Sequence, residues 1–233
     1  MDKALTTFQG FDERFFEFFE DLKHNNERPW FQENKERYLE VVVTPLQGFI
    51  QAMAPALDMI SPHIRADPRR NGGSLFRIYR DTRFSKDKTP YKTHAGVQFR
   101  HAQAKDAHAP GFYFHVSSTE LFLAAGVWHP ASEPLAAIRQ AIHEQPKQWI
   151  EARDHEPFNK RFHLAGESLK RPPRGFSADH ELLTDLKRKD FICVMEMAPP
   201  DLFRRDLVEM VSRSFAICTP FMAFLCKALG VPF

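Results

Sequence analysis

The sequence predicts an α+β fold, in which one mostly antiparallel sheet of about five or more strands packs against helices from the N- and C-terminal parts of the chain. Three observations lead to this prediction. Apolar residues repeat at helical spacing before residue 60, alternate with polar residues over 74–128, and return mainly to helical spacing after residue 132. The strand candidates follow one another closely, which favours antiparallel pairing. Helices and strands segregated along the chain in this way are typical of the α+β class.

Length and composition predict one globular domain with an aromatic core. The 233 residues suffice for one large domain or two small ones, and no linker divides them, so we expect a single domain over residues 1–233. Phenylalanine occurs 23 times, which predicts a core rich in aromatic side chains. The predicted order is a helical part over 12–60, a strand-rich part over 74–128, a helical part over 132–188, a returning strand over 191–197 and C-terminal helices over 200–229.

The N-terminal part is predicted to consist of consecutive helices separated by asparagine and proline. Asp12 can cap the first helix, and Asn25 ends it because asparagine tolerates left-handed backbone conformations. Pro29 can begin a second helix, since its fixed φ and missing N–H suit a first turn. Pro45 kinks or restarts this helix, and Pro62 closes the helical part.

Five segments have the alternation or the β-propensity of strands. In the first, Phe76 and Ile78 lie on one face, and Arg77 and Tyr79 lie on the other. The next residues, 82–90, are too polar and irregular for a core strand and are predicted to form a loop. The predicted strands lie near 74–80, 94–101, 111–117, 120–128 and 191–197.

Helices are predicted to return after the fourth strand. Ser132 is a suitable N-cap for the segment EPLAAIRQAI, and shorter helices are expected near 147–153 and 158–164. The pair Pro199–Pro200 can begin a long last helix, which Pro220 should break.

The segment FRIYRDTRFSKDKTPYKTH, from Phe76 to His94, carries the whole positive excess of the chain. It contains six basic and two acidic residues, which gives +4, whereas the whole chain carries +2 at pH 7. Arginine pairs bidentately with phosphate or carboxylate, and loop residues can converge on a ligand. We therefore predict an anion site at residues 77–92, the basic block. Its ligand-binding candidates are Arg77, Arg80, Arg83, Lys86, Lys88, Tyr91 and Lys92.

A second basic cluster occupies the loop from Lys170 to Gly175, which two prolines restrict. Its candidates Lys170 and Arg171 can close over the same anion from another side. The alternative for both clusters is a solvated loop, in which the arginines of the basic block pair with Asp81, Asp87 and acidic helices.

Histidines at or beside the predicted strands are the candidates for catalysis. His94 and His115 lie where an imidazole can act as a general acid or base next to the cations. Together with His129, their spacing matches no metal-binding signature, so no metal site is predicted. The motifs GxxxxGK(S/T), GxGxxG, HExxH and GxSxG do not occur, and no cofactor is predicted.

The expected function is the binding of a phosphorylated or otherwise anionic ligand, with or without a reaction. A pI near 8.4 is mild for a protein that grips nucleic acid, which favours an anionic small molecule as partner. A non-catalytic nucleic-acid-binding module and a protein-interaction scaffold are the alternatives. No apolar run of about 18 residues and no signal-peptide pattern occur, so no membrane partner is expected. Three widely spaced cysteines in apolar surroundings predict reduced thiols and a cytoplasmic location.

Four blocks of the chain carry a resemblance to a known family. In sequence order they are FFEFFEDLKHNNERPWFQENKERY (15–38), FRIYRDTRFSKDKTPYKTHAGVQF (76–99), GFYFHVSSTELFLAAGVWHP (111–130) and, more weakly, LKRPPRGFSADHELLTDLKRKDF (169–191). With these blocks the sequence resembles the DUF2461 family over most of its length. The resemblance implies no activity, cofactor or catalytic residue, so the candidate residues above follow from this sequence alone.

Overall fold

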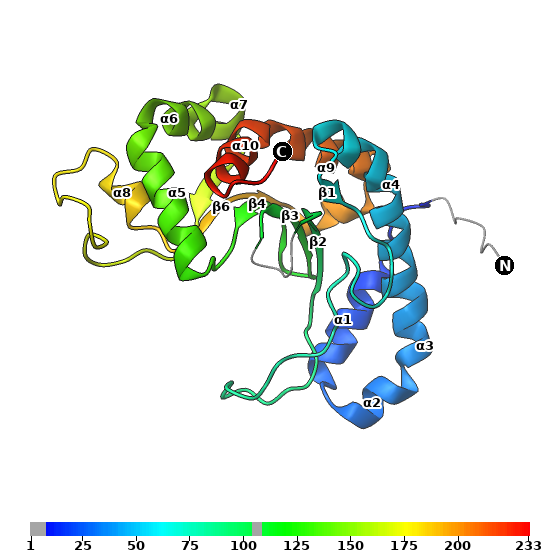
Figure 1. The fold of residues 1–233 in the computed structure, drawn as a ribbon. Helices are drawn as coiled ribbons and strands as arrows, with labels where there is room; N and C mark the ends of the chain where they lie inside the picture. Colours follow the sequence, from blue (N-terminus) through cyan, green and yellow to red (C-terminus); the bar gives the residue numbers. More distant parts are fainter. Residues whose placement is uncertain (1–7, 104–108) are drawn as a thin grey trace.

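In the part of the chain that the structure describes, the sheet has six strands in the order β1-β2-β3-β4-β6-β5, and every neighbouring pair is antiparallel (Figure 1). The computed structural model describes residues 8–103 and 109–233. The strands are β1 Ile64–Arg65, β2 Ala95–His101, β3 Gly111–Val116, β4 Leu121–Val127, β5 His163–Ala165 and β6 Phe191–Met197. One antiparallel sheet with helices before and after it is the α+β arrangement that the sequence predicts.

The N-terminal helices follow the proline and aspartate signals of the sequence. Asp12 accepts a hydrogen bond from the backbone N–H of Arg14 (3.0 Å) at the start of the first helix. Pro29 and Pro45 lie in the first turns of α2 and α4, where a missing N–H costs nothing. The elements are α1 Arg14–His24, α2 Arg28–Glu33, α3 Lys35–Tyr38, the π-helical turn η1 Leu39–Val43 and α4 Thr44–Ile60.

The remaining helices follow β4 and β6. The last helix is interrupted as predicted, because Pro220 lies in the first turn of α10, which begins directly after Cys218. Pro199 begins a short 3-10 helix rather than a long α-helix. The elements are α5 Ser132–Glu144, α6 Pro146–Asp154, α7 Glu156–Asn159, α8 Leu183–Leu186, the 3-10 helix η2 Pro199–Phe203, α9 Leu207–Ile217 and α10 Thr219–Ala228.

Helices cover one face of the sheet. Phe114 of β3 packs against Phe49 of α4, with ring centroids 5.0 Å apart, and Phe112 stacks on Phe215 of α9 at 4.5 Å. Figure 1 shows α4, α9 and α10 on this side, α1–α3 toward one end of the sheet and α5–α8 toward the other. Buried side chains of the helices and of the covered face form one continuous hydrophobic cluster.

Four of the five predicted strands are confirmed as β2, β3, β4 and β6, but the prediction for 74–80 is wrong. That segment is extended and makes only scattered bonds, such as Phe76 N to Gly96 O (2.9 Å). It leaves the edge of β2 and then pairs with residues 90–92 instead, through an isolated bridge between Tyr79 and Tyr91. Because the segment changes partner halfway, no continuous ladder forms.

Two short strands at the edges of the sheet were not predicted. The strands β1 and β5 have two and three residues, too few to show an alternation with period 2. The helix predicted over 158–164 is wrong in its second half, because α7 ends at Asn159 and residues 163–165 pair with β6.

Within residues 8–103 and 109–233, no single helix combines the length and the apolar character of a membrane span. The helices α9 and α10 pass that test jointly, with a bend of 53° between them. Their buried residues include Phe215 and Phe221, which belong to the hydrophobic cluster.

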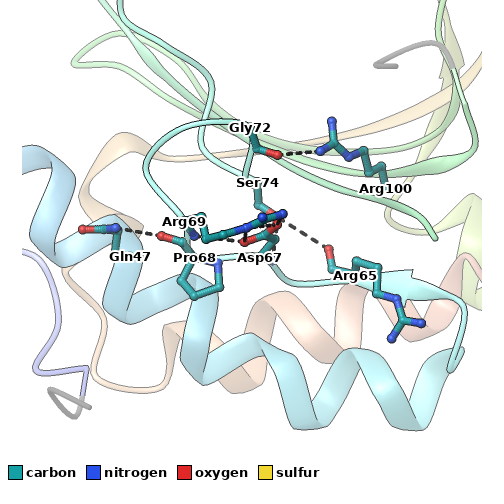
Figure 2. A network of polar contacts seen from close by, with 8 residues as sticks. All are labelled: Gln47, Arg65, Asp67, Pro68, Arg69, Gly72, Ser74 and Arg100. Atoms are coloured by element: carbon teal, nitrogen blue, oxygen red, sulfur yellow. Dashed lines mark hydrogen bonds and ion pairs between the residues drawn. The ribbon is translucent and has the colours of Figure 1, made fainter. Parts of the chain in front are cut away.

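A polar network fixes the loop that leads from β1 into the extended segment (Figure 2). Asp67 is central to it, since its carboxylate accepts bonds from the backbone and the guanidinium of Arg69, the shortest at 2.6 Å. Three further bonds tie the loop to its surroundings, namely Gln47 Nε2 to Pro68 O (2.7 Å), Asp67 N to Ser74 Oγ (3.0 Å) and Arg100 Nη2 to Gly72 O (2.6 Å). The loop therefore sets where residues 74–80 begin and how they cross the edge of the sheet.

Candidate functional site

The face of the sheet opposite α4 and α9 is hollowed into a groove with a volume of about 880 Å³. Paired residues of neighbouring strands point to the same side, so the register arranges side chains in rows across this face. Gly126 pairs with Gly111, and in the next row Ala124 pairs with Tyr113 and Val194. Glycine and alanine thus form the floor of the groove, and their small size leaves the hollow.

Aromatic side chains form the walls of this groove. Tyr113 contacts Phe76 on one side and Phe122 on the other, with ring centroids 6.1 and 5.9 Å apart. Trp128, at the end of β4, also lines the groove and is 51% exposed. The groove is therefore mainly apolar, with polar groups gathered toward one end.

The Tyr113 side chain lies over β2 because Gly96 has no side chain. A Cβ atom at Gly96 would lie 2.5 Å from the Tyr113 hydroxyl, which is itself 3.1 Å from His115 Nδ1. Burial raises the pKa of Tyr113, so the phenol stays protonated and shares a hydrogen bond with Nδ1, whose direction depends on the tautomer of His115. In the tautomer with its proton on Nε2, His115 accepts the bond from the phenol, and its N–H lies on the side of Glu120, with Nε2 3.8 Å from Oε2.

The structure brings the two predicted catalytic histidines together. The rings of His94 and His115 lie 4.5 Å apart, and His115 stacks on Phe122 at 4.5 Å. Burial lowers the pKa of His115 to about 4, and burial together with the neighbouring His115 and Lys92 lowers that of His94 to about 4 as well. Both imidazoles are therefore neutral at pH 7 and can donate and accept hydrogen bonds.

A small polar pocket of about 130 Å³ adjoins the groove. The two cavities share His94, Thr119 and Glu120. On the far side of the pocket, Glu20 accepts a hydrogen bond from Ser118 and forms an ion pair with Lys23 at 3.7 Å. Other residues that line the pocket are Phe19, Thr93, His115 and Ser117.

Two arginines of the basic block are paired within the block itself. Arg80 donates to Asp87 and Thr89, and Arg83 forms an ion pair with Asp81 at 2.6 Å. Hydrogen bonds from these partners hold the pKa of Asp81 and of Asp87 at about 2. Internal pairing, which the sequence left open as the alternative, is thus the arrangement of these two arginines.

Other residues of the basic block point in different directions. Lys92 lines the groove, donates to Arg77 O (3.0 Å) and lies 5.5 Å from the centre of the Phe76 ring. The Arg77 side chain lies in a separate hollow of about 90 Å³ beside Tyr38. Tyr91 is buried against Phe31, with ring centroids 4.2 Å apart.

Lys86 and Lys88 are exposed in the loop of the block, where Lys88 donates to Thr82 O (2.8 Å). Lys170 and Arg171 are exposed in the loop before α8, and Figure 1 shows that loop far from the loop of the basic block. The two basic clusters therefore do not meet. No group of three or more histidine, cysteine, aspartate and glutamate side chains could hold a metal ion in the described part of the chain.

The floor and the acidic rim of the groove were not identified from the sequence. In the segment ELFLAAGVW, Phe122, Ala124 and Gly126 share one face, and this small-residue alternation was the available signal. At Gly126 the φ is +129° and a Cβ atom would lie 2.0 Å from Phe191 O, so this position of the floor requires glycine. Glu120 and Glu196 gain significance only from their positions beside the cavity.

Comparison with known proteins gives one family. A family model described as "Conserved hypothetical protein (DUF2461)" matches residues 14–224, which is most of the chain. No curated protein and no solved structure matches the chain significantly.

Proposed function

This chain belongs to the DUF2461 family, and we propose that it binds an anionic small molecule with an apolar body in the groove of its sheet. The observation that carries the proposal is the groove itself. An apolar cavity with a few convergent polar groups and perturbed pKa values is the usual form of a small-molecule site. At one end of this groove Lys92, His94 and Tyr113 supply such groups beside an apolar floor.

Lys92 is the member of the basic block best placed to bind the anion. It is half-buried, and burial together with the charge of Arg77 lowers its pKa, which shows that its ammonium group is partly removed from water. One of its three donors is used by Arg77 O, and the others are available for a ligand. Arg80 adds positive potential nearby, since its charge also acts on His94.

A small molecule explains these features better than nucleic acid does. A nucleic-acid site needs exposed, uncompensated cations along a surface, but Arg80 and Arg83 are each paired with an aspartate of the same loop. The cation at the groove instead lies in a concavity sized for one small ligand. A phosphorylated or carboxylated molecule is therefore the partner we propose.

If the bound molecule reacts, His94 is the group that we propose for proton transfer. It lines both the groove and the polar pocket, whereas His115 lies behind it and is held by the Tyr113 hydroxyl. We further propose a cytoplasmic location, which the three free and buried cysteines support.

The test compares two lysines of the same block. The probes are phenyl phosphate, 1-naphthyl phosphate and indole-3-propanoate, and binding is measured by titration calorimetry and by the shift of the thermal midpoint. A charge-assisted hydrogen bond is worth roughly 1.5–3 kcal/mol, so Lys92→Met should weaken binding about tenfold or more. The matched control Lys88→Met removes an exposed charge of the same loop and should leave binding unchanged.

Two results would count against the proposal. One is that no probe binds the wild type or shifts its midpoint. The other is an equal loss in both lysine variants, which would indicate diffuse electrostatic attraction. In that case short RNA and DNA should bind, with an affinity that falls steeply between two salt concentrations, because neutralised phosphates release condensed counterions.

A further inference from the structure

Two charges of opposite sign act on His94 at the polar end of the groove. Lys92 lowers the pKa of this histidine and Glu120 raises it, so both charges lie close to the same imidazole. Both side chains also line the groove. A ligand that carried only negative charge would be attracted by Lys92 and repelled by Glu120.

In the described residues, Glu120 forms no ion pair with a lysine or arginine, whereas the neighbouring carboxylate of Glu20 does. Glu20, across the polar pocket, is balanced by Lys23 and accepts a hydrogen bond from Ser118. For Glu120, His115 at 3.8 Å is the one basic side chain within 4 Å in the described ranges, and its imidazole is neutral at pH 7. The carboxylate of Glu120 therefore leaves a negative charge uncompensated where the two cavities join.

The polar pocket suits a compact group that donates hydrogen bonds. With a volume of about 130 Å³ it is far smaller than the groove. Its walls present hydroxyl oxygens of serine and threonine next to the two carboxylates. An ammonium group has three donors and one positive charge, and these match hydroxyl acceptors around a carboxylate.

We propose that the ligand is a zwitterion of the amino-acid type, whose anionic group binds Lys92, whose ammonium group binds Glu120 at the mouth of the polar pocket, and whose large apolar side chain lies on the floor of Ala124 and Gly126. This inference rests on the proposed function, because it assigns the second charge of the same ligand. His94, which lines both cavities, then lies beside the charged end of the zwitterion.

Three probes with one indole ring separate the two charges. They are L-tryptophan, which has both charges, indole-3-propanoate, which lacks the amine, and tryptamine, which lacks the carboxylate. We expect wild-type protein to bind tryptophan at least about fivefold more tightly than indole-3-propanoate. Glu120→Gln should abolish this preference, because it removes the charge and keeps the shape, and it should leave the affinity for indole-3-propanoate equal or higher.

The matched control is Glu196→Gln. Glu196 also lines the groove and is about as exposed as Glu120, with 69% and 68% of the side chain accessible, but it pairs with His163 at 3.6 Å. This control should keep the preference for tryptophan. Lys92→Met should weaken the binding of tryptophan and of indole-3-propanoate, and it should leave the binding of tryptamine unchanged. The thermal midpoint of each variant checks that it is folded.

The failure of this inference differs from the failure of the proposed function. If indole-3-propanoate binds as tightly as tryptophan and Glu120→Gln changes neither affinity, the assignment of an ammonium group to the ligand is wrong, and the anion site stands. If the phosphate probes bind and neither indole carboxylate does, this inference falls and the anion site stands, whereas both proposals fall if no probe binds. A loss of preference in Glu196→Gln as large as in Glu120→Gln would also overturn the assignment of the ammonium group.

Discussion

Two histidines of the polar pocket show how their surroundings set the state of a titratable group. His115 is 8% exposed, stacks on Phe122 and shares a hydrogen bond with the Tyr113 hydroxyl. An imidazolium there would lose hydration, and the exposed carboxylate of Glu120, 3.8 Å away, does not offset that loss, so the neutral form is favoured. His94 lies against the His115 ring and also experiences the charge of Lys92.

The depressed pKa values predict how stability depends on pH. Each histidine titrates at about 4 in the native protein and at about 6.5 in an unfolded chain. Between these values the unfolded state binds protons that the native state does not, so the free energy of unfolding should fall as the pH is lowered from about 6.5 to about 4. Above pH 6.5 the imidazoles are neutral in both states, so the two histidines no longer change the free energy of unfolding with pH.

Urea unfolding at pH 7.0, 6.0 and 5.0 measures this slope. His94→Gln and His115→Gln should each have a shallower slope than wild type, because one titrating group is removed. His24→Gln changes an exposed histidine at the end of α1 and is the control. Equal slopes in all four proteins would show that the two imidazoles do not resist protonation.

Long regular elements were predictable from the sequence because a local pattern determines them. The strands β2, β3, β4 and β6 each have six or seven residues, enough for alternation or for a clear β-propensity. The extended segment 74–80 has the same pattern but divides its bonds between two partners. Pairing partners are a property of the folded chain, and no local pattern specifies them.

The same limit explains which parts of the site were found. His94, His115 and Lys92 were identified because their chemistry is visible in a single residue. The hollow above Ala124 depends on which residues of the neighbouring strands pair with it, and on the position of α4, α9 and α10 on the opposite face of the sheet. The pairing of Arg80 with Asp87 depends on how the loop folds back, so the number of charges alone overestimated the free positive charge of the block.

The loop between β1 and the extended segment depends on two adjacent glycines in different ways. At Gly72 the φ is +74°, and a Cβ atom would meet nothing within 4 Å. At Gly73 a Cβ atom would lie 2.1 Å from Arg69 O and 2.6 Å from Asp67 O. The first glycine is needed for its backbone conformation alone, and the second because backbone atoms approach it too closely for any side chain.

Replacing each glycine by alanine should therefore have unequal effects. Gly72→Ala places alanine in the left-handed region and should cost about 1–2 kcal/mol of the free energy of unfolding. Gly73→Ala forces carbonyl groups of the network in Figure 2 to move, and overpacking of this kind costs about 1–3 kcal/mol or more. Urea unfolding should show Gly73→Ala to be the less stable variant, and the reverse order would contradict the close approach.

The continuous hydrophobic cluster ties the C-terminal helices to the sheet. Cys193 of β6 and Cys218, between α9 and α10, are fully buried with their sulfur atoms 3.7 Å apart, and Cys226 of α10 is fully buried as well. Burial raises the pKa of Cys226 to about 12 and raises that of Cys218 too. The thiolate is the reactive form, so these thiols are protected by burial and by protonation together.

We therefore expect the three thiols to react with a disulfide reagent only when the whole molecule opens. For a domain with at least about 5 kcal/mol of stability, the native reaction should be at least about a thousandfold slower than in the unfolded chain. The measurement follows labelling at each cysteine by mass spectrometry from zero to moderate urea. A single core predicts equal rates with the same urea dependence, because α9, α10 and β6 are exposed in one transition. Faster labelling of Cys218 and Cys226 than of Cys193, with a weaker urea dependence, would show instead that the two helices detach while the sheet stays folded.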